Sequence, residues 1–171
     1  MSRLIDCIDL YHEAFGFDEA EFEDELFGCC FKYCKTIEVN GKVVSMLFAF
    51  PCEIVFENKT LNAKYIFAVA TKIEERGKGY MSKLLNRVKQ ETNSLLFLRP
   101  ANEGLIKLYG SLGFKSIPAK SIECEFPFIK PLEEFASLAE KYKTPDSSSF
   151  TAMYYSTKEN IEKINFIYSM E

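Results

Sequence analysis

The hydrophobic pattern near the start of the chain has the period of an α-helix. One stripe of apolar residues, at spacings of three and four, predicts a helix over residues 2–15 with Ser2 as its N-cap and Gly16 at its end. This stripe consists of Leu4, Ile8, Tyr11 and Phe15. A second stripe predicts a helix over residues 18–33. It consists of Phe22, Leu26, Cys29 and Tyr33, and it leaves outside the acidic side chains of Glu19, Glu21, Glu23, Asp24 and Glu25.

From Cys34 onward the apolar residues alternate with polar ones, which is typical of strands. The pair Asn40-Gly41 separates two such runs, residues 36–39 and 43–48, and strongly favours a tight β-hairpin. Pro51 is expected to interrupt the second run. A further strand pair is expected from two later runs, residues 53–56 and 61–70.

Helices and strands alternate in the rest of the chain. The pattern predicts helices over residues 81–92, 105–112 and 132–142, strands over 95–98 and 122–126, and a loop over 146–149. The run 95–98 is entirely apolar, which indicates a strand buried on both faces with a parallel neighbour. Residues 164–170 are interpreted as a strand, although helical spacing fits them too. This order predicts an α/β (α+β) fold with a mixed, mostly antiparallel twisted sheet of six to seven strands flanked by helices.

Composition limits the classes of function that the chain can serve. Its 171 residues, 47% of them apolar, provide the material for a single domain over residues 1–171. A net charge of −4 gives no basic surface for nucleic acid or anionic lipid. The start of the chain lacks the apolar core of an export signal, and no run reaches the ~18 apolar residues of a membrane span, so a cytoplasmic protein is expected.

Cysteine and histidine usage argues against a metal site and against a histidine-based nucleophile. The six cysteines form no Cys-x-x-Cys pattern and are expected to be buried thiols. His12 is the only histidine. A zinc site would therefore need several scattered thiolates, and a catalytic triad would have to be built on His12 alone. No metal is expected, and His12 is expected on the flank of a helix.

The segment 69–82 carries the clearest candidate chemistry, because an apolar strand ends there in a basic turn, Arg-Gly-Lys-Gly at 76–79. Met81 and the apolar residues after it have helical spacing, which puts the turn at the start of a helix. The free N–H groups and the dipole of a helix start favour a phosphate, and Gly77 and Gly79 lack the Cβ atoms that would keep it away. The P-loop and dinucleotide-binding glycine patterns are both absent. The four residues alone also fit a solvated surface turn.

Two motifs together resemble the GNAT superfamily of N-acetyltransferases. Residues 76–81 are similar to the family's pyrophosphate motif Arg-x-x-Gly-x-(Gly/Ala), with Met81 in place of the small residue. Asn102, Tyr109 and Gly113-Phe114 have the spacing of the family's second hallmark. The resemblance covers the chain from its start to about Phe126. The residues of both motif regions resemble those in the N-terminal half of the enhanced-intracellular-survival type branch. Members of that branch are longer, multidomain chains.

The resemblance implies an N-acetyltransferase that moves an acetyl group directly from acetyl-CoA to a primary amine. It implies a strand that splays from its neighbour and offers backbone groups to the pantetheine, and a turn whose N–H groups bind the pyrophosphate. The implied cofactor-binding residues are Val69, Ala70, Thr71, Arg76, Gly77, Lys78, Gly79, Tyr80, Met81, Ser82 and Asn102. The implied catalytic residue is Tyr109, as the general acid that protonates the departing thiolate.

These roles have alternatives at the level of sequence. Tyr109 lies on an apolar stripe and also fits a core residue, and Asn102 also fits a helix N-cap, a role compatible with coenzyme binding. No general base is assigned. The candidates are Glu53, Tyr65, Glu74, Glu75 and the carboxylate that follows Glu171. The alternative function is a non-catalytic sensor of coenzyme A, or an interaction module, on the same fold.

The acceptor is expected to be a small-molecule or peptide amine. The resemblance implies that the first two helices form a wall of the acceptor channel, and these helices carry most of the acidic cluster. Such a cluster either is a solvated face or steers a cationic acceptor toward the thioester. Neither nucleic acid nor a membrane is an expected partner, and a homodimer is left open.

Overall fold

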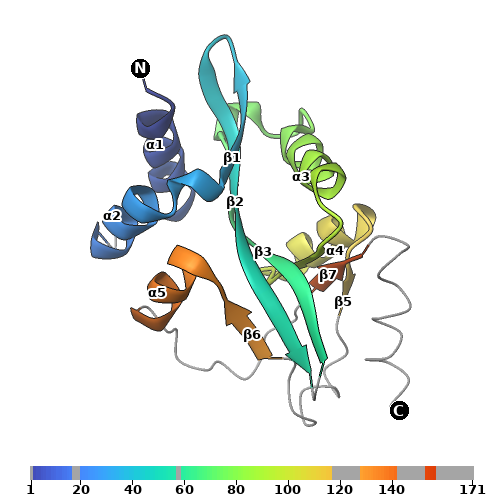
Figure 1. The fold of residues 1–171 in the computed structure, drawn as a ribbon. Coiled ribbons are helices and arrows are strands. Elements are labelled where there is room, and N and C mark those ends of the chain that lie inside the picture. Colours follow the sequence, from blue (N-terminus) through green and yellow to red (C-terminus); the bar gives the residue numbers. More distant parts are fainter. Residues whose placement is uncertain (1, 17–19, 57–58, 117–127, 142–152, 157–171) are drawn as a thin grey trace.

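The computed structural model describes residues 2–16, 20–56, 59–116, 128–141 and 153–156 (Figure 1). The first elements are α1 (Arg3–Phe15), α2 (Ala20–Cys29), a 3₁₀ helix (Phe31–Tyr33), β1 (Cys34–Val39), β2 (Lys42–Phe56) and β3 (Lys59–Thr71). A second 3₁₀ helix (Ile73–Glu75), α3 (Tyr80–Glu91), β4 (Leu95–Leu98), α4 (Glu103–Ser111) and β5 (Lys115–Ser116) follow. The last elements are β6 (Phe128–Pro131), α5 (Glu133–Lys141) and β7 (Met153–Tyr155).

The first helix is confirmed, but its buried face differs from the predicted one. The Ser2 hydroxyl oxygen accepts a hydrogen bond from the backbone N–H of Ile5 at 3.4 Å, and Gly16 ends the helix with a φ of +89°. The buried apolar face is formed by Cys7, Leu10 and Tyr11. Phe15 is 49% exposed, because it lies one turn beyond the end of the sheet-facing stripe.

The second predicted helix is divided and its polar side is not fully outside. α2 ends at Cys29, and the 3₁₀ helix takes the chain into β1. Glu23 was expected to be exposed, but it is buried and its carboxylate makes a hydrogen bond with the ring of His12 of α1. Cys29 was expected to be buried and is exposed, whereas Cys30 takes the inward position. The exchange follows from the end of α2 at Cys29, because Cys30 lies beyond the helix at the N-cap of the 3₁₀ helix and turns inward there.

The hairpin between β1 and β2 is confirmed, whereas Pro51 does not interrupt β2. Asn40 and Gly41 both have positive φ, at 50° and 74°, as the tight turn requires. β2 continues through Pro51 because its outer edge changes neighbours there: β1 pairs with the strand up to Phe48, and β6 pairs with it from Cys52. A proline without an N–H is tolerated at this gap in the hydrogen-bond ladder.

The seven-stranded sheet has the order β1-β2-β3-β4-β7-β5, with β6 alongside β2. β3 and β4 are parallel and the other pairs are antiparallel, so the predicted mixed sheet is confirmed. β5, β6 and β7 were not predicted. Two predicted segments, residues 122–126 and 164–170, and the loop 146–149 lie outside the described residues.

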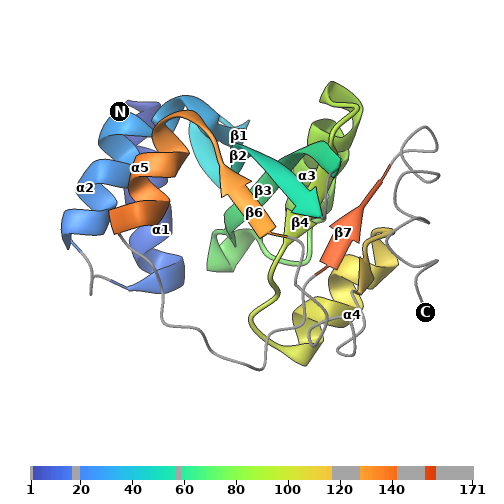
Figure 2. The ribbon, with the colours of Figure 1, turned by 60° about the horizontal axis from the view of Figure 1, so that its bottom comes forward.

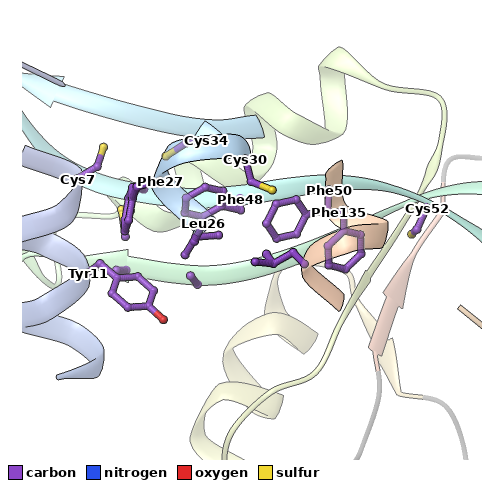
Figure 3. Packing of buried hydrophobic residues seen from close by; sticks show 14 of the residues in the cluster. Cys7, Tyr11, Leu26, Phe27, Cys30, Cys34, Phe48, Phe50, Cys52 and Phe135 are labelled. Atoms are coloured by element: carbon purple, nitrogen blue, oxygen red, sulfur yellow. The ribbon is translucent and has the colours of Figure 1, made fainter. Parts of the chain in front are cut away.

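Helices cover the sheet on both faces (Figures 1 and 2). We call the face under α1, α2 and α5 the α1 face, and the face under α3 and α4 the α3 face. Each face has its own apolar core. On the α1 face the rings of Phe50 and Phe135 stack with centroids 4.4 Å apart and an angle of 7°, which fixes α5 to β2 (Figure 3). None of the described helices is long and apolar enough to cross a membrane.

A bulge separates β3 from its parallel neighbour. β4 pairs with β3 only from Ala63 to Tyr65, although β3 continues to Thr71. Just beyond the last pair, Ala68 has a φ of +48°, and the register with β2 shifts there. An extra residue of this kind bends a strand and increases its twist, so the two parallel strands part. We call this point, just after Tyr65 and Phe97, the fork.

Glycine substitutions should show that the backbone at the bulge is strained. The left-handed conformation costs an alanine roughly 1–2 kcal/mol, so Ala68→Gly should relieve strain that offsets the lost methyl group. Ala70→Gly, in a regular part of the same strand, should lower the free energy of unfolding by about 1–2 kcal/mol. Urea unfolding of both variants measures the difference, and equal losses would contradict a strained bulge at Ala68.

Candidate active site

Beyond Tyr65, one edge of β3 has no strand partner among the described residues, although the Thr71 carbonyl oxygen accepts a hydrogen bond from Arg76. Ala70 faces β2, because its carbonyl oxygen accepts a hydrogen bond from the Ser45 hydroxyl at 3.0 Å. Successive peptide groups of a strand point to opposite sides, so the backbone groups of Val69 and Thr71 point to the side where β4 has left. An extended ligand can pair with this edge as a further strand would.

The turn between β3 and α3 forms an open cradle of backbone N–H groups. Gly77 and Gly79 have φ values of +77° and +78°, and a Cβ atom added to either would meet nothing within 4 Å. Gly79 is the N-cap of α3 and makes no side-chain cap. Among the described residues, no hydrogen-bond acceptor is found for the N–H groups of residues 77–82. This arrangement suits a phosphate, which such donors and the helix dipole attract.

The charged side chains of the turn differ in how available they are. Arg76 donates through Nε to the carbonyl oxygen of Thr71 at 3.2 Å, and it has no ion pair among the described residues. Lys78 lies 2.8 Å from the carboxylate of Glu75, which raises the pKa of the lysine. Glu75 was expected to be solvated or to pair with Arg76, so its bond to Lys78 is a correction. An anion that binds at this turn would contact the guanidinium of Arg76, which has no carboxylate partner among the described residues. It would have to compete with Glu75 for the ammonium group of Lys78.

The turn is also tied to α1 by a contact that the sequence did not reveal. The carboxylate of Glu13 accepts a hydrogen bond from the backbone N–H of Ile73 at 2.6 Å. Tyr80, Met81 and Ser82 are partly buried in the first turn of α3. Met81, where the family motif has a small residue, packs against the apolar core of the α3 face. Its flexible side chain thus lies beneath the helix start and leaves the N–H cradle open.

The helix α4 carries the second motif. Asn102 caps it, because its side-chain oxygen accepts a hydrogen bond from the backbone N–H of Leu105 at 3.0 Å. The side-chain NH₂ group of Asn102 stays available, so the N-cap role and a coenzyme contact are compatible. Tyr109 lies two turns further on, in the core of the α3 face, where its ring meets Phe114 edge to face at 5.8 Å.

The side chain of Tyr109 is buried. The residue is 5% exposed, and no hydrogen bond of its hydroxyl is found in the described part of the chain. Burial raises the pKa of Tyr109 to about 12, so the phenol keeps its proton at neutral pH. Buried tyrosine hydroxyls usually have a hydrogen-bond partner. The described residues thus leave the Tyr109 hydroxyl as a donor without an acceptor.

Other candidate chemistry is used in structural contacts. Glu53 pairs with Lys130 of β6 at 3.2 Å, away from the fork, and is not a free base. Within the acidic cluster, Glu25 pairs with Lys141 of α5. Of the described residues, no three His, Cys, Asp or Glu side chains lie close enough together to hold a metal ion. The carboxylate after Glu171 lies outside the described residues.

Comparisons with known proteins support the family and the fold. A sequence model described as an acetyltransferase (GNAT) domain matches residues 2–117. Among curated proteins, none matches the chain.

Three solved structures illustrate the structural likeness. A GCN5-related N-acetyltransferase from Kribbella flavida has a TM-score of 0.58 at 18% identity, over 67% of this chain and 31% of that chain. A histone acetyltransferase HPA2 and related acetyltransferase from Corynebacterium glutamicum has a TM-score of 0.55 at 17% identity, over 90% of each chain. Eis1 from Mycobacterium abscessus has a TM-score of 0.50 at 14% identity, over 64% of this chain and 30% of Eis1. At these identities the likeness shows the fold, and the chain spans less than a third of the Kribbella protein and of Eis1.

The buried hydroxyl of Tyr109 should be visible in the pH dependence of stability. Burial raises the pKa of Tyr109 to about 12 in the folded state, whereas the unfolded chain loses this proton near pH 10. The stabilisation that comes from the neutral buried hydroxyl is therefore complete below about pH 10 and is lost as the pH rises toward 12. Between these values the wild type should lose on the order of 2 kcal/mol more stability than Tyr109→Phe. Denaturant unfolding of both proteins at several pH values measures the difference, and parallel curves would mean that the hydroxyl reaches solvent.

Proposed function

Because the chain belongs to the acetyltransferase (GNAT) domain family, we propose that it transfers an acetyl group from acetyl-CoA to a primary amine. Members of this family carry out acyl transfer to small-molecule or peptide acceptors. The observation that carries the proposal is the buried hydroxyl of Tyr109, which has no hydrogen-bond partner among the described residues and lies on the helix after β4. A fold alone would support binding as well as catalysis, whereas a desolvated proton donor has a specific use in acyl transfer.

The coenzyme would be held by backbone groups more than by side chains. The N–H groups of residues 77–82 and the Arg76 guanidinium would bind the pyrophosphate, with Lys78 as a further cation. The open edge at Val69 and Thr71 would pair with the amides of the pantetheine. Asn102 would offer its side-chain NH₂ group to the same arm. When bound, acetyl-CoA supplies an activated thioester.

Tyr109 would complete the transfer. The amine nitrogen forms a bond to the carbonyl carbon, the carbon–sulfur bond breaks, and the departing thiolate takes the proton of the Tyr109 hydroxyl. The nitrogen releases its own proton to solvent, and the phenolate regains one from the same source. The raised pKa of Tyr109 favours rapid return to the neutral phenol after each turnover.

Gly79→Ala should weaken acetyl-CoA binding, because its methyl group would occupy the approach to the N–H cradle. Gly41→Ala is the matched control, since Gly41 has a similar φ of +74°, has the same open surroundings and lies in the β1–β2 hairpin. The two variants should lose similar stability, and only Gly79→Ala should raise the Kd by about tenfold or more. Calorimetric titration with acetyl-CoA tests this, and an unchanged Kd would remove the phosphate site from the proposal.

Tyr109→Phe should separate catalysis from coenzyme binding. The substitution keeps the ring packing and removes the proton donor, so kcat should fall by a factor of about 10² while the Kd for acetyl-CoA stays constant. The assay is release of free coenzyme A thiol in a screen of amines. An equal loss of binding and rate would assign Tyr109 to the core. Tight acetyl-CoA binding without turnover of any amine would favour a coenzyme A sensor instead.

A further inference from the structure

The central strand β2 carries a single polar side chain within a buried apolar run. Residues 43–50 are all buried, and Ser45 is the only polar residue among them. Its side chain lies in a residue that is 0% exposed. Burial of a hydroxyl group costs free energy unless its hydrogen bonds are made, so packing alone would favour an alanine here. The hydrogen bonds of Ser45 therefore indicate what the residue does.

Ser45 makes two hydrogen bonds with the end of β3. Its Oγ lies 3.0 Å from the carbonyl oxygen of Ala70 and 3.0 Å from the hydroxyl oxygen of Thr71. A carbonyl oxygen can only accept, so the one hydrogen of the Ser45 hydroxyl is donated to Ala70. The bond between the two hydroxyl groups is then donated by Thr71. This direction leaves Thr71 Oγ1 with lone pairs only, so it can act toward a ligand only as an acceptor.

The Thr71 hydroxyl lies on the face of the sheet that carries α3 and α4. Val69 packs against the core of the α3 face, and side chains two positions apart on a strand share a face. Thr71 is partly buried, and its carbonyl oxygen accepts the hydrogen bond from Arg76 of the phosphate turn. Thr71 thus stands between the edge that β4 has left and the turn that precedes α3.

Ser45 also holds the end of β3 in place beyond the bulge. The register between β2 and β3 shifts just after the pair Met46–Ala70, next to the positive φ of Ala68. The hydroxyl of Ser45 bonds the Ala70 carbonyl oxygen directly beside this shift. A bulge disrupts the ladder locally, and a side-chain donor at this point compensates for the disruption. Both the place and the polarity of the Thr71 hydroxyl therefore depend on Ser45.

We propose that Ser45 is a positioning residue for the coenzyme and that it acts through Thr71. Because Ser45 holds the Thr71 hydrogen, Thr71 Oγ1 accepts a hydrogen bond from an N–H or O–H donor of the pantetheine arm. A Thr71 hydroxyl that could rotate freely would have to be ordered when the ligand binds, which weakens binding. The inference rests on the proposed binding of acetyl-CoA and adds a side-chain contact to the backbone contacts described above.

A double-mutant cycle, measured by calorimetric titration with acetyl-CoA, tests the inference. Thr71→Val removes the acceptor but keeps the bond between Ser45 and Ala70, and it should raise the Kd by about fivefold. Thr71→Ser keeps a hydroxyl and should stay within about twofold of wild type. Ser45→Ala frees the Thr71 hydroxyl and should raise the Kd by about threefold. With Thr71→Val already present, Ser45→Ala should not raise the Kd further, because no hydroxyl is left to orient.

Thr36→Val is the matched control. Thr36 is also a partly buried strand threonine, and its carbonyl oxygen also accepts a hydrogen bond from an arginine, Arg87, at 3.1 Å. This variant should bind acetyl-CoA like wild type. Urea unfolding of all variants separates positioning from packing. Ser45→Ala should lower the free energy of unfolding with or without the Thr71 hydroxyl, but it should change the Kd only when that hydroxyl is present.

Two results would overturn the inference. One is an unchanged Kd for Thr71→Val, and the other is an equal effect of Ser45→Ala on the Kd with and without the Thr71 hydroxyl. Both would leave the acetyl-CoA site itself intact. Failure of the wild type to bind acetyl-CoA would instead overturn the proposed function.

Discussion

The parting of β3 from β4 is the constraint on which the candidate site depends. Two parallel strands that stayed paired to their ends would satisfy each other's backbone groups and leave no edge for a ligand. The extra residue at Ala68 prevents this, because it turns the end of β3 away just after Tyr65. The same bend exposes the groups of Val69 and Thr71 and carries the chain into the glycine turn at the start of α3. One backbone irregularity thus sets both the edge of β3 that has left β4 and the position of the glycine turn.

Two tyrosines with similar hydroxyl groups lie on opposite faces of the sheet. Tyr109 belongs to the core of the α3 face, and Tyr65 packs against the core of the α1 face. Neither hydroxyl has a hydrogen-bond partner among the described residues. Burial raises the pKa of both phenols, so both keep their protons at neutral pH.

The sequence predicted the periodic elements and the local motifs, and it missed what depends on contacts between distant segments. The cap at Ser2, the Asn40-Gly41 turn and the buried run of β4 follow from local rules, and each was confirmed. The continuation of β2 through Pro51 could not be predicted, because it depends on where β1 stops and β6 begins. The bulge at Ala68 left no signal either, since alanine is an ordinary strand residue with no preference for positive φ.

Acceptor recognition illustrates the same limit. In the sequence, the acidic residues of the second helix lie close together, and their negative charge predicts a cationic partner. In the fold, Glu23 and Glu25 are paired with His12 and Lys141, so much of that charge holds α1, α2 and α5 together. A carboxylate that is bound to a neighbouring side chain attracts a distant cation less than a free one does. The acidic run in the sequence is therefore a weaker guide to a cationic acceptor than its charge alone suggests.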